Sequence, residues 1–151
     1  MLERQRSRGV GVSGIANPSL PKKSSTASAL TGVPYDNSPW DRNSTGFRNR
    51  VEGWNPANDL HNLVHIFTGG DMLPSSSPND PVFYLNHCNV DRIWERWMQV
   101  NGRSYRPTNA TPGAPVGTRL NDPVLTPFGP SVTSGQLLNM TAIYTYDSLA
   151  V

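Results

Sequence analysis

Three histidines are the residues of this chain whose type and spacing best suit chemistry. His61, His65 and His87 are the only histidines among its 151 residues. His61 and His65 are four apart, so on a helix their imidazoles lie one turn apart on the same face, close enough to share a metal ion. His87 falls in the next stretch with a helical period. Because neighbouring helices can build a metal site from inward-facing side chains, the pattern predicts a three-nitrogen site.

The residue types leave the identity of the metal open. Three neutral imidazoles suit copper, zinc, iron or nickel, and no cysteine or carboxylate is placed to add to them. No glutamate follows His61, so the zinc-protease pattern of two histidines with an adjacent glutamate base is not met. Three histidines with an open fourth position would still fit a hydrolytic zinc site.

Two predicted helices position these histidines. The first begins at Asn55-Pro56 or at Asn58-Asp59, both of which suit a helix start, and it ends at Gly69-Gly70. The second begins after Asn79-Asp80 with Pro81 and reaches about Val100. Apolar residues recur at helical spacing along both stretches and mark one buried face on each. These residues are Leu60, Leu63, Val64 and Phe67 in the first stretch, and Phe83, Val90, Trp94 and Trp97 in the second.

The remaining chain predicts short elements joined by long irregular connections, since it contains 13 glycines and 14 prolines. The fold class is therefore mainly α. The expected further elements are a short helix over 25–31, a helical stretch over 47–53, a loop over 71–78, one or two helical turns over 134–140 and a short C-terminal strand over 142–147.

Composition sets the domain organisation and excludes several classes of protein. Residues 1–24 are polar and basic and predict a linker or arm, followed by one domain over 25–151. No basic or aromatic patch continues that arm, so nucleic-acid binding is not expected. Cys88 is the only cysteine, which excludes an intrachain disulfide and suggests a small buried thiol. No membrane span and no signal peptide is present, so the compartment is open, or cytoplasmic if Met1 is the true start.

The motifs resemble the copper-B half of the tyrosinases, members of the type-3 copper family. Several short motifs agree in order and spacing, from about residue 25 to the C-terminus. The matching pieces are Tyr35-Asp36, Pro39-Trp40, Phe47-Arg48-Asn49, Glu52-Gly53-Trp54, Leu60-His61-Asn62, Val64-His65, Gly69-Gly70, Ser77-Pro78-Asn79-Asp80-Pro81-Val82-Phe83, His87, Asp91, Trp94, Asp122-Pro123, Leu125, Pro127-Phe128, Tyr144 and Tyr146.

The resemblance implies half of a four-helix-bundle copper domain. Tyrosinases hold two copper ions, each on three histidines, bind dioxygen between them, hydroxylate monophenols in the ortho position and oxidise diphenols to quinones. By position, His61, His65 and His87 would hold one copper ion. The chain has no further histidine, so the second copper is expected from a complementary copper-A polypeptide or from a missing N-terminal half.

The resemblance also implies roles for residues beside the ligands. Glu52 and Asn62 match the pair that holds a water able to take the proton of a phenol, whose pKa is about 10. Phe83 and Ile66 would line the substrate site. Asp91, one turn after His87, would accept a ring N–H from a ligand and fix its tautomer, or would pair with a neighbouring arginine, Arg92 or Arg96. A thioether between cysteine and histidine, known in some relatives, is not expected at Cys88.

These implications predict a copper-dependent oxidoreductase, of the tyrosinase or catechol-oxidase kind, that acts on a phenolic small molecule and dioxygen and is inactive without its copper-A half. Two alternatives remain. The first is a haemocyanin-like oxygen carrier or a single-copper binding module without oxidase turnover. The second is the hydrolytic zinc enzyme that three histidines would also fit.

Overall fold

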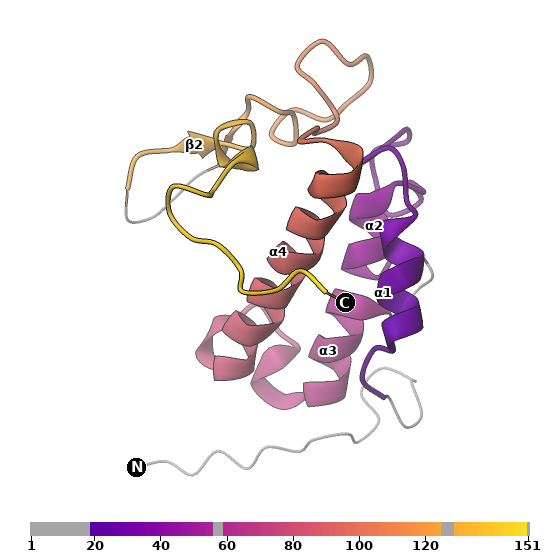
Figure 1. Ribbon diagram of the computed structural model, residues 1–151, viewed down its shortest axis with the longest axis vertical. Coiled ribbons are helices and arrows are strands. Elements are labelled where there is room, and N and C mark those ends of the chain that lie inside the picture. Colours follow the sequence, from indigo (N-terminus) through magenta and orange to yellow (C-terminus); the bar gives the residue numbers. More distant parts are fainter. Residues whose placement is uncertain (1–18, 56–58, 125–128, 151) are drawn as a thin grey trace.

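Helix α4 (Pro81–Asn101) is the element on which the rest of the chain is assembled. A computed structural model describes residues 19–55, 59–124 and 129–150. In Figure 1, α4 runs through the middle of the molecule, with α1 and α2 along one side and the C-terminal segment crossing in front of it. The helix begins where the Asp80 carboxylate accepts a hydrogen bond from the Val82 amide at 2.9 Å. It ends at Gly102, whose φ of +84° favours glycine.

The predicted helices are present, and the fold is mainly helical as expected. Their bounds agree with the predicted ones within a few residues because turn and cap residues mark most ends. The structure has α1 at Lys23–Leu30, α2 at Phe47–Glu52, α3 at Leu60–Thr68, the 3₁₀ turns η1 at Gly70–Met72, η2 at Ser77–Asn79 and η3 at Gln136–Leu138, and the strands β1 at Pro123–Val124 and β2 at Val132–Thr133.

The core lies around the C-terminal half of α4. Trp97 stacks on Phe47 of α2 with ring centroids 4.9 Å apart, and both side chains are buried. The Trp97 indole N–H donates to the Gly32 carbonyl at 2.7 Å, which ties the turn after α1 to α4. Burial of such large rings supplies much of the hydrophobic stabilisation of a domain of this size. The other buried apolar residues of this core are Ala29, Val51, Leu60, Ile93 and Met98.

One glycine fixes the approach of α2 to α3. Gly53 ends α2 with a φ of +90°, and a Cβ on this residue would lie 1.9 Å from the Asp59 carbonyl oxygen. Only glycine therefore allows the end of α2 to lie against the start of α3. The Asp59 carboxylate accepts from the Leu60 amide, so α3 has the later of its two predicted starts. Residue 56, on which the earlier start depends, lies outside the described residues.

The strand predicted over 142–147 is wrong. Residues 141–143 form a turn, in which the amides of Ile143 and Tyr144 both donate to the Met140 carbonyl. The alternation of this stretch has another cause: Tyr144 and Tyr146, two apart, both donate to a side chain on α4. Since no strand of the described residues lies alongside to pair with it, the segment stays irregular. The antiparallel pair in the described structure is β1 with β2, where Val124 pairs with Val132.

Two further expectations concern the chain as a whole. The basic arm predicted over 1–24 falls mostly on residues 1–18, which lie outside the described residues, so that boundary stays a prediction. Among the residues that the structure describes, no helix combines the length and the apolar character needed to cross a membrane.

Candidate metal centre

The three histidines meet at one point between α3 and α4. His61 and His65 lie one turn apart on α3, and His87 lies on the second turn of α4. The Nε2 atom of His61 is 3.1 Å from Nε2 of His65 and also 3.1 Å from Nε2 of His87. One ligand atom from each ring lies within 4.8 Å of the others, and all three residues are half-buried. The predicted convergence of the rings is therefore what the structure has.

The opposite ring nitrogens are all engaged by acceptors. Nδ1 of His65 donates to the Met72 carbonyl at 2.5 Å, and Nδ1 of His87 donates to the Phe83 carbonyl at 2.7 Å. Nδ1 of His61 faces two side chains with acceptor oxygens, one on α3 and one on α2. These are Asn62, whose Oδ1 is 3.2 Å away, and Glu52, whose Oε2 is 3.3 Å away.

This arrangement fits a bound cation. A carbonyl can only accept, so Nδ1 must carry the proton in His65 and His87, and in the neutral rings Nε2 keeps a free lone pair. Three lone pairs that face one another at these distances have no donor between them. A metal ion that prefers imidazole, such as copper or zinc, would satisfy all three at once. Acceptors on the outer nitrogens also hold the rings and raise their basicity as ligands.

Glu52 and His61 influence each other's charge. The hydrogen bond from His61 lowers the pKa of the Glu52 carboxyl, although its partial burial opposes the change. Burial lowers the pKa of His61, but the hydrogen bond and the charge of Glu52 outweigh it, so the pKa is raised overall. Burial lowers the pKa of His65, which lacks such a carboxylate. Without metal, His61 is therefore the first of these two rings to take a proton.

The Phe83 ring lies against two of the histidines, and Ile66 adjoins one of them along α3. The Phe83 ring lies 3.9 Å from the His87 ring, centroid to centroid, at an interplanar angle of 30°, and it meets His65 edge-on at 6.2 Å. Phe83 thus serves twice, because its carbonyl accepts from His87 while its ring covers it. Ile66 follows His65 on α3 and is half-buried. Whether either side chain contacts a substrate stays a prediction.

Asp91 has a different partner from the one expected. Its Oδ2 accepts from the Tyr144 hydroxyl at 2.7 Å and from the Tyr146 hydroxyl, and no described histidine donates to it. Nδ1 of His87 is already bound to the carbonyl one turn before it, so it has no proton left for Asp91. The described residues show no ion pair between Asp91 and Arg92 or Arg96 either. Asp91 joins the C-terminal segment to α4.

Cys88 also differs from expectation. The thiol was expected to be buried, but the residue is exposed, because position 88 turns away from the face of α4 that carries Ile93 and Trp97.

The role of Met72 and Phe83 in holding the histidines was missed at the sequence level, where Phe83 is expected only to line the substrate site. Met72 and Phe83 act through main-chain carbonyls, which every residue has, so residue type gave no signal for the first of them. For Phe83 a signal existed, since it lies four residues before His87 and its carbonyl is on the same helical face. The Met72 side chain is fully buried and anchors η1, which places its carbonyl against His65.

Comparisons with known proteins agree with this geometry. Residues 5–100 match the family model described as the common central domain of tyrosinase. The chain is 41% identical over 136 residues to a tyrosinase of Streptomyces glaucescens, covering 89% of this chain and 47% of the relative. It is 40% identical to a tyrosinase of Streptomyces antibioticus, covering 95% and 49%. It is 37% identical to the 5,6-dihydroxyindole-2-carboxylic acid oxidase of Bos taurus, covering 85% and 26%.

The extent of these matches settles the relationship. The chain spans about half the length of the Streptomyces tyrosinases, and the match includes both helices that carry the histidines. Since the family model covers well over half of the sequence and includes the three converging rings, this chain belongs to the tyrosinase family.

Proposed function

We propose that this chain holds one copper ion of a two-copper oxidase that acts on phenols with dioxygen. The observation that carries the proposal is the convergence of three Nε2 atoms whose opposite nitrogens are all engaged by acceptors. His61, His65 and His87 would be the ligands. Membership of the tyrosinase family favours copper over the zinc that three histidines would also accept. Bound copper would supply the activation of dioxygen and the redox chemistry.

Glu52 and Asn62 would manage the proton of the substrate. Both reach the outer nitrogen of His61, so a water bound between them would lie beside the metal site. The hydrogen bond from His61 lowers the pKa of the Glu52 carboxyl, so the carboxylate is ionised at neutral pH and would orient that water as the acceptor of the phenol proton. A phenol with a pKa of about 10 needs such a route to lose its proton at neutral pH. This supports hydroxylation of monophenols as well as oxidation of diphenols.

Phe83 and Ile66 would shape the place where the phenol ring rests. The Phe83 ring already covers His87 and meets His65 edge-on, which leaves an apolar surface beside two of the ligands. Ile66 lies next to His65 on α3. An aromatic substrate would pack on such a surface through its own ring while its oxygen points toward the histidines.

A complementary copper-A half would complete the site. Among the described residues, one group of three metal-binding side chains is present. Large apolar side chains are exposed on and around the first turn of α4, beside the histidines: Tyr84 is 62% exposed and Leu85 is 71% exposed. An exposed apolar patch of this kind marks a surface that another polypeptide, or further chain, would cover. We propose that this covering part brings the second copper ion.

The test combines this chain with a partner of known family. The chain would be co-expressed with the part of the Streptomyces glaucescens tyrosinase that it does not match, and purified with copper. We expect two copper ions per complex by elemental mass spectrometry, and uptake of oxygen when phenol or catechol is added. The same complex with His87→Ala would lose one copper ion and the oxygen uptake, which serves as the matched control.

Other results would support the alternatives. One copper ion per chain with no oxygen uptake, whichever partner is present, would favour a single-copper module. Two copper ions that bind oxygen reversibly without consuming phenol would favour a haemocyanin-like carrier. Zinc retained in preference to copper, together with hydrolysis of an ester or amide, would overturn the proposal.

A further inference from the structure

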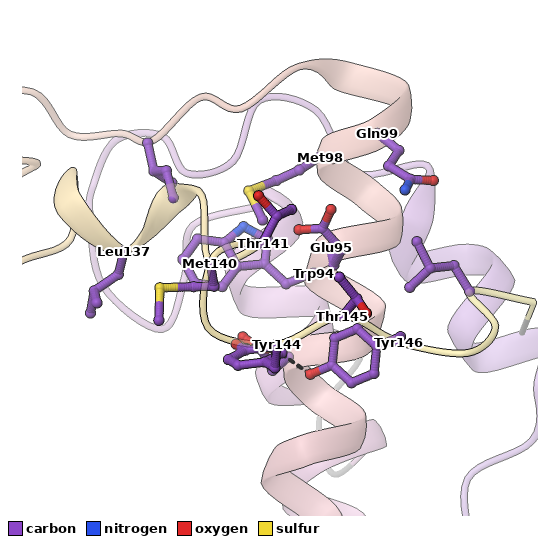
Figure 2. A pocket seen from close by; sticks show the side chains of 13 residues that line it. Trp94, Glu95, Met98, Gln99, Leu137, Met140, Thr141, Tyr144, Thr145 and Tyr146 are labelled. Carbon is purple, nitrogen blue, oxygen red and sulfur yellow. Dashed lines mark hydrogen bonds between the residues drawn. The ribbon is translucent and has the colours of Figure 1, made fainter.

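Helix α4 is joined to its neighbours by different contacts along its length. Where the C-terminal segment crosses the helix, the hydroxyls of Tyr144 and Tyr146 donate to Asp91, and side chains of the helix and the segment line a cavity between them (Figure 2). Between α3 and α4, which carry the three histidines, the described residues show a single hydrogen bond apart from the contacts between imidazole rings. Its donor is the side chain of Asn86.

Asn86 lies directly before His87 in α4 and is 7% exposed. Its Nδ2 is 3.4 Å from the main-chain carbonyl oxygen of His61 on α3. A carbonyl can only accept, so the amide nitrogen of Asn86, and not its Oδ1, must face it. The bond is long and therefore weak. It nevertheless joins the neighbour of one candidate ligand to the main chain of another.

The two helices leave a space between them on this side of the histidines. A groove of about 410 Å³ opens between the start of α1, α3 and α4, and both His61 and Asn86 line it. Apolar side chains of the two ligand helices reach the same groove: Leu60 and Val64 from α3, and Val90 and Ile93 from α4. Because side chains do not fill this space, packing on this side fixes the distance between His61 and His87 less tightly than a closed core would.

The metal-free rings give the two helices a reason to separate. Nε2 of His61 is 3.1 Å from Nε2 of His65 and from Nε2 of His87, and in the neutral rings each of these atoms carries a lone pair. Lone pairs that face one another without a donor repel. A hydrogen bond between the ligand helices opposes that repulsion and keeps the rings converged before a cation binds. A site that is already formed binds more tightly, because less order has to be gained on binding.

We infer that Asn86 is a positioning residue of the metal centre, whose amide holds α3 and α4 at the spacing at which His61 and His87 share one cation. Among the described hydrogen bonds, the Asn86 side chain reaches the main chain of His61 and no imidazole ring. It acts on the ligands through the helix that carries them. The inference rests on the proposed metal centre, but it depends neither on the phenol that is oxidised nor on the copper-A half.

The test starts from the full chain, made metal-free with a chelator and then titrated with copper(II) against a competing chelator. Asn86→Leu keeps the approximate size of the side chain but cannot donate. It leaves no acceptor unpaired, because the His61 carbonyl still accepts a main-chain hydrogen bond within α3. Copper affinity should fall about threefold to tenfold, the effect of one hydrogen bond, while the urea midpoint of the metal-free chain stays the same or rises.

Two further measurements separate positioning from a general effect on the fold. The electron paramagnetic resonance spectrum of bound copper(II) should change in Asn86→Leu, since the nitrogen ligands move relative to one another. Asn86→Gln can still donate, and its extra methylene group has room in the groove, so it should recover most of the affinity. Asn89→Leu is the matched control, because Asn89 lines the same groove but is exposed and accepts from Arg92 of its own helix. This control should match the wild type in affinity and spectrum.

Four results would each overturn the inference. They are an Asn86→Leu variant with the affinity and spectrum of the wild type, an equal loss of affinity in Asn89→Leu, an Asn86→Gln variant as weak as Asn86→Leu, and a loss of affinity in Asn86→Leu accompanied by a lower urea midpoint. The last result would mean that Asn86 only stabilises the fold. A wild-type chain that binds no copper would overturn the proposed function, and the inference with it.

Discussion

The two halves of α4 differ in what surrounds them. The C-terminal half carries Trp97 and Ile93, which are 1% and 2% exposed and pack against α1 and α2. The N-terminal half carries His87, and its neighbours Tyr84 and Leu85 are mostly exposed. One continuous helix thus supports a closed core at one end and an open site with histidines at the other.

This difference teaches that stability and metal binding are separable in this fold. The core end has the stacked aromatic rings and buried aliphatic side chains that stabilise a small domain. The histidine end has half-buried rings held by hydrogen bonds on their outer nitrogens. We therefore expect substitutions in the C-terminal half of α4 to change mainly the stability of the fold, and substitutions in the N-terminal half to change mainly the affinity for metal. The following predictions test that expectation.

The largest effect is expected at the core end. Trp97→Ala removes a buried ring that stacks on Phe47 and leaves the Gly32 carbonyl without its donor. The free energy of unfolding should fall by about 3–5 kcal/mol, measured by urea denaturation of the metal-free chain. Trp54→Ala is the matched control, since that residue is 47% exposed and its loss should lower stability by clearly less than the loss of the fully buried ring. Equal losses in the two variants would contradict the placement of the core.

The next effect is expected at the histidine end. His87→Ala removes one of the three ligands. Loss of a residue that only hydrogen-bonds to a ligand ring lowers metal affinity roughly tenfold to hundredfold, so loss of a ligand should lower the affinity for copper by more than that. Isothermal titration with a competing chelator would measure it. The unfolding free energy of the metal-free chain should change far less than in Trp97→Ala. Arg96→Ala, an exposed change on the same helix, should alter neither quantity. If His87→Ala unfolded the metal-free chain, the two halves would not be separable.

The helices that carry the histidines could be predicted from the sequence better than the hydrogen bonds that hold the histidine rings. Spacing placed His61 and His65 on one helical face and His87 on the next helix, because helical periodicity is local information. The acceptor for His65 is the carbonyl of Met72, seven residues away across the Gly69 turn, and a carbonyl leaves no trace in residue type. Only the folded loop brings it into place.

Asp91 shows a second limit of the sequence. Its position one turn after His87 suggested a role at the metal site, yet its partners Tyr144 and Tyr146 come from more than fifty residues further along the chain. Such distant contacts are decided by packing and not by local spacing. The wrongly predicted strand has the same origin, since the two tyrosines alternate in order to reach Asp91 on one helix.

A smaller effect on copper affinity is expected at Glu52, the last residue of α2. Glu52→Gln keeps the shape of the side chain but removes the charge beside Nδ1 of His61. Copper affinity should fall by about tenfold to hundredfold, since outer partners orient a ligand ring and raise its basicity. Glu95→Gln is the matched control, because that carboxylate pairs with Arg103 and contacts no histidine among the described residues. The same loss in both variants would show that net charge, and not the contact with His61, sets the affinity.

The smallest effect is the dependence of stability on pH in the metal-free chain, and it isolates the Glu52–His61 pair. The folded pKa of Glu52 lies below its usual 4.5, so its contribution is full above pH 4.5 and is lost as the pH falls through the folded pKa. The folded pKa of His61 lies above its usual 6.5, so its contribution is full below pH 6.5 and is lost as the pH rises through the folded pKa. Both contributions are therefore complete between pH 4.5 and 6.5.

Subtracting the stability of Glu52→Gln from that of the wild type cancels the contributions of the other titrating groups to the pH dependence. His65, whose pKa is lowered by burial, destabilises the fold as the pH falls below 6.5, but it does so in both proteins. The difference in unfolding free energy between the two, measured by urea denaturation at several pH values, should therefore be largest between pH 4.5 and 6.5 and decline on either side. A difference that does not vary with pH would mean that Glu52 stabilises the end of α2 by packing alone. In that case its charge would also be unavailable to His61 when copper is bound, and the third prediction would fail with this one.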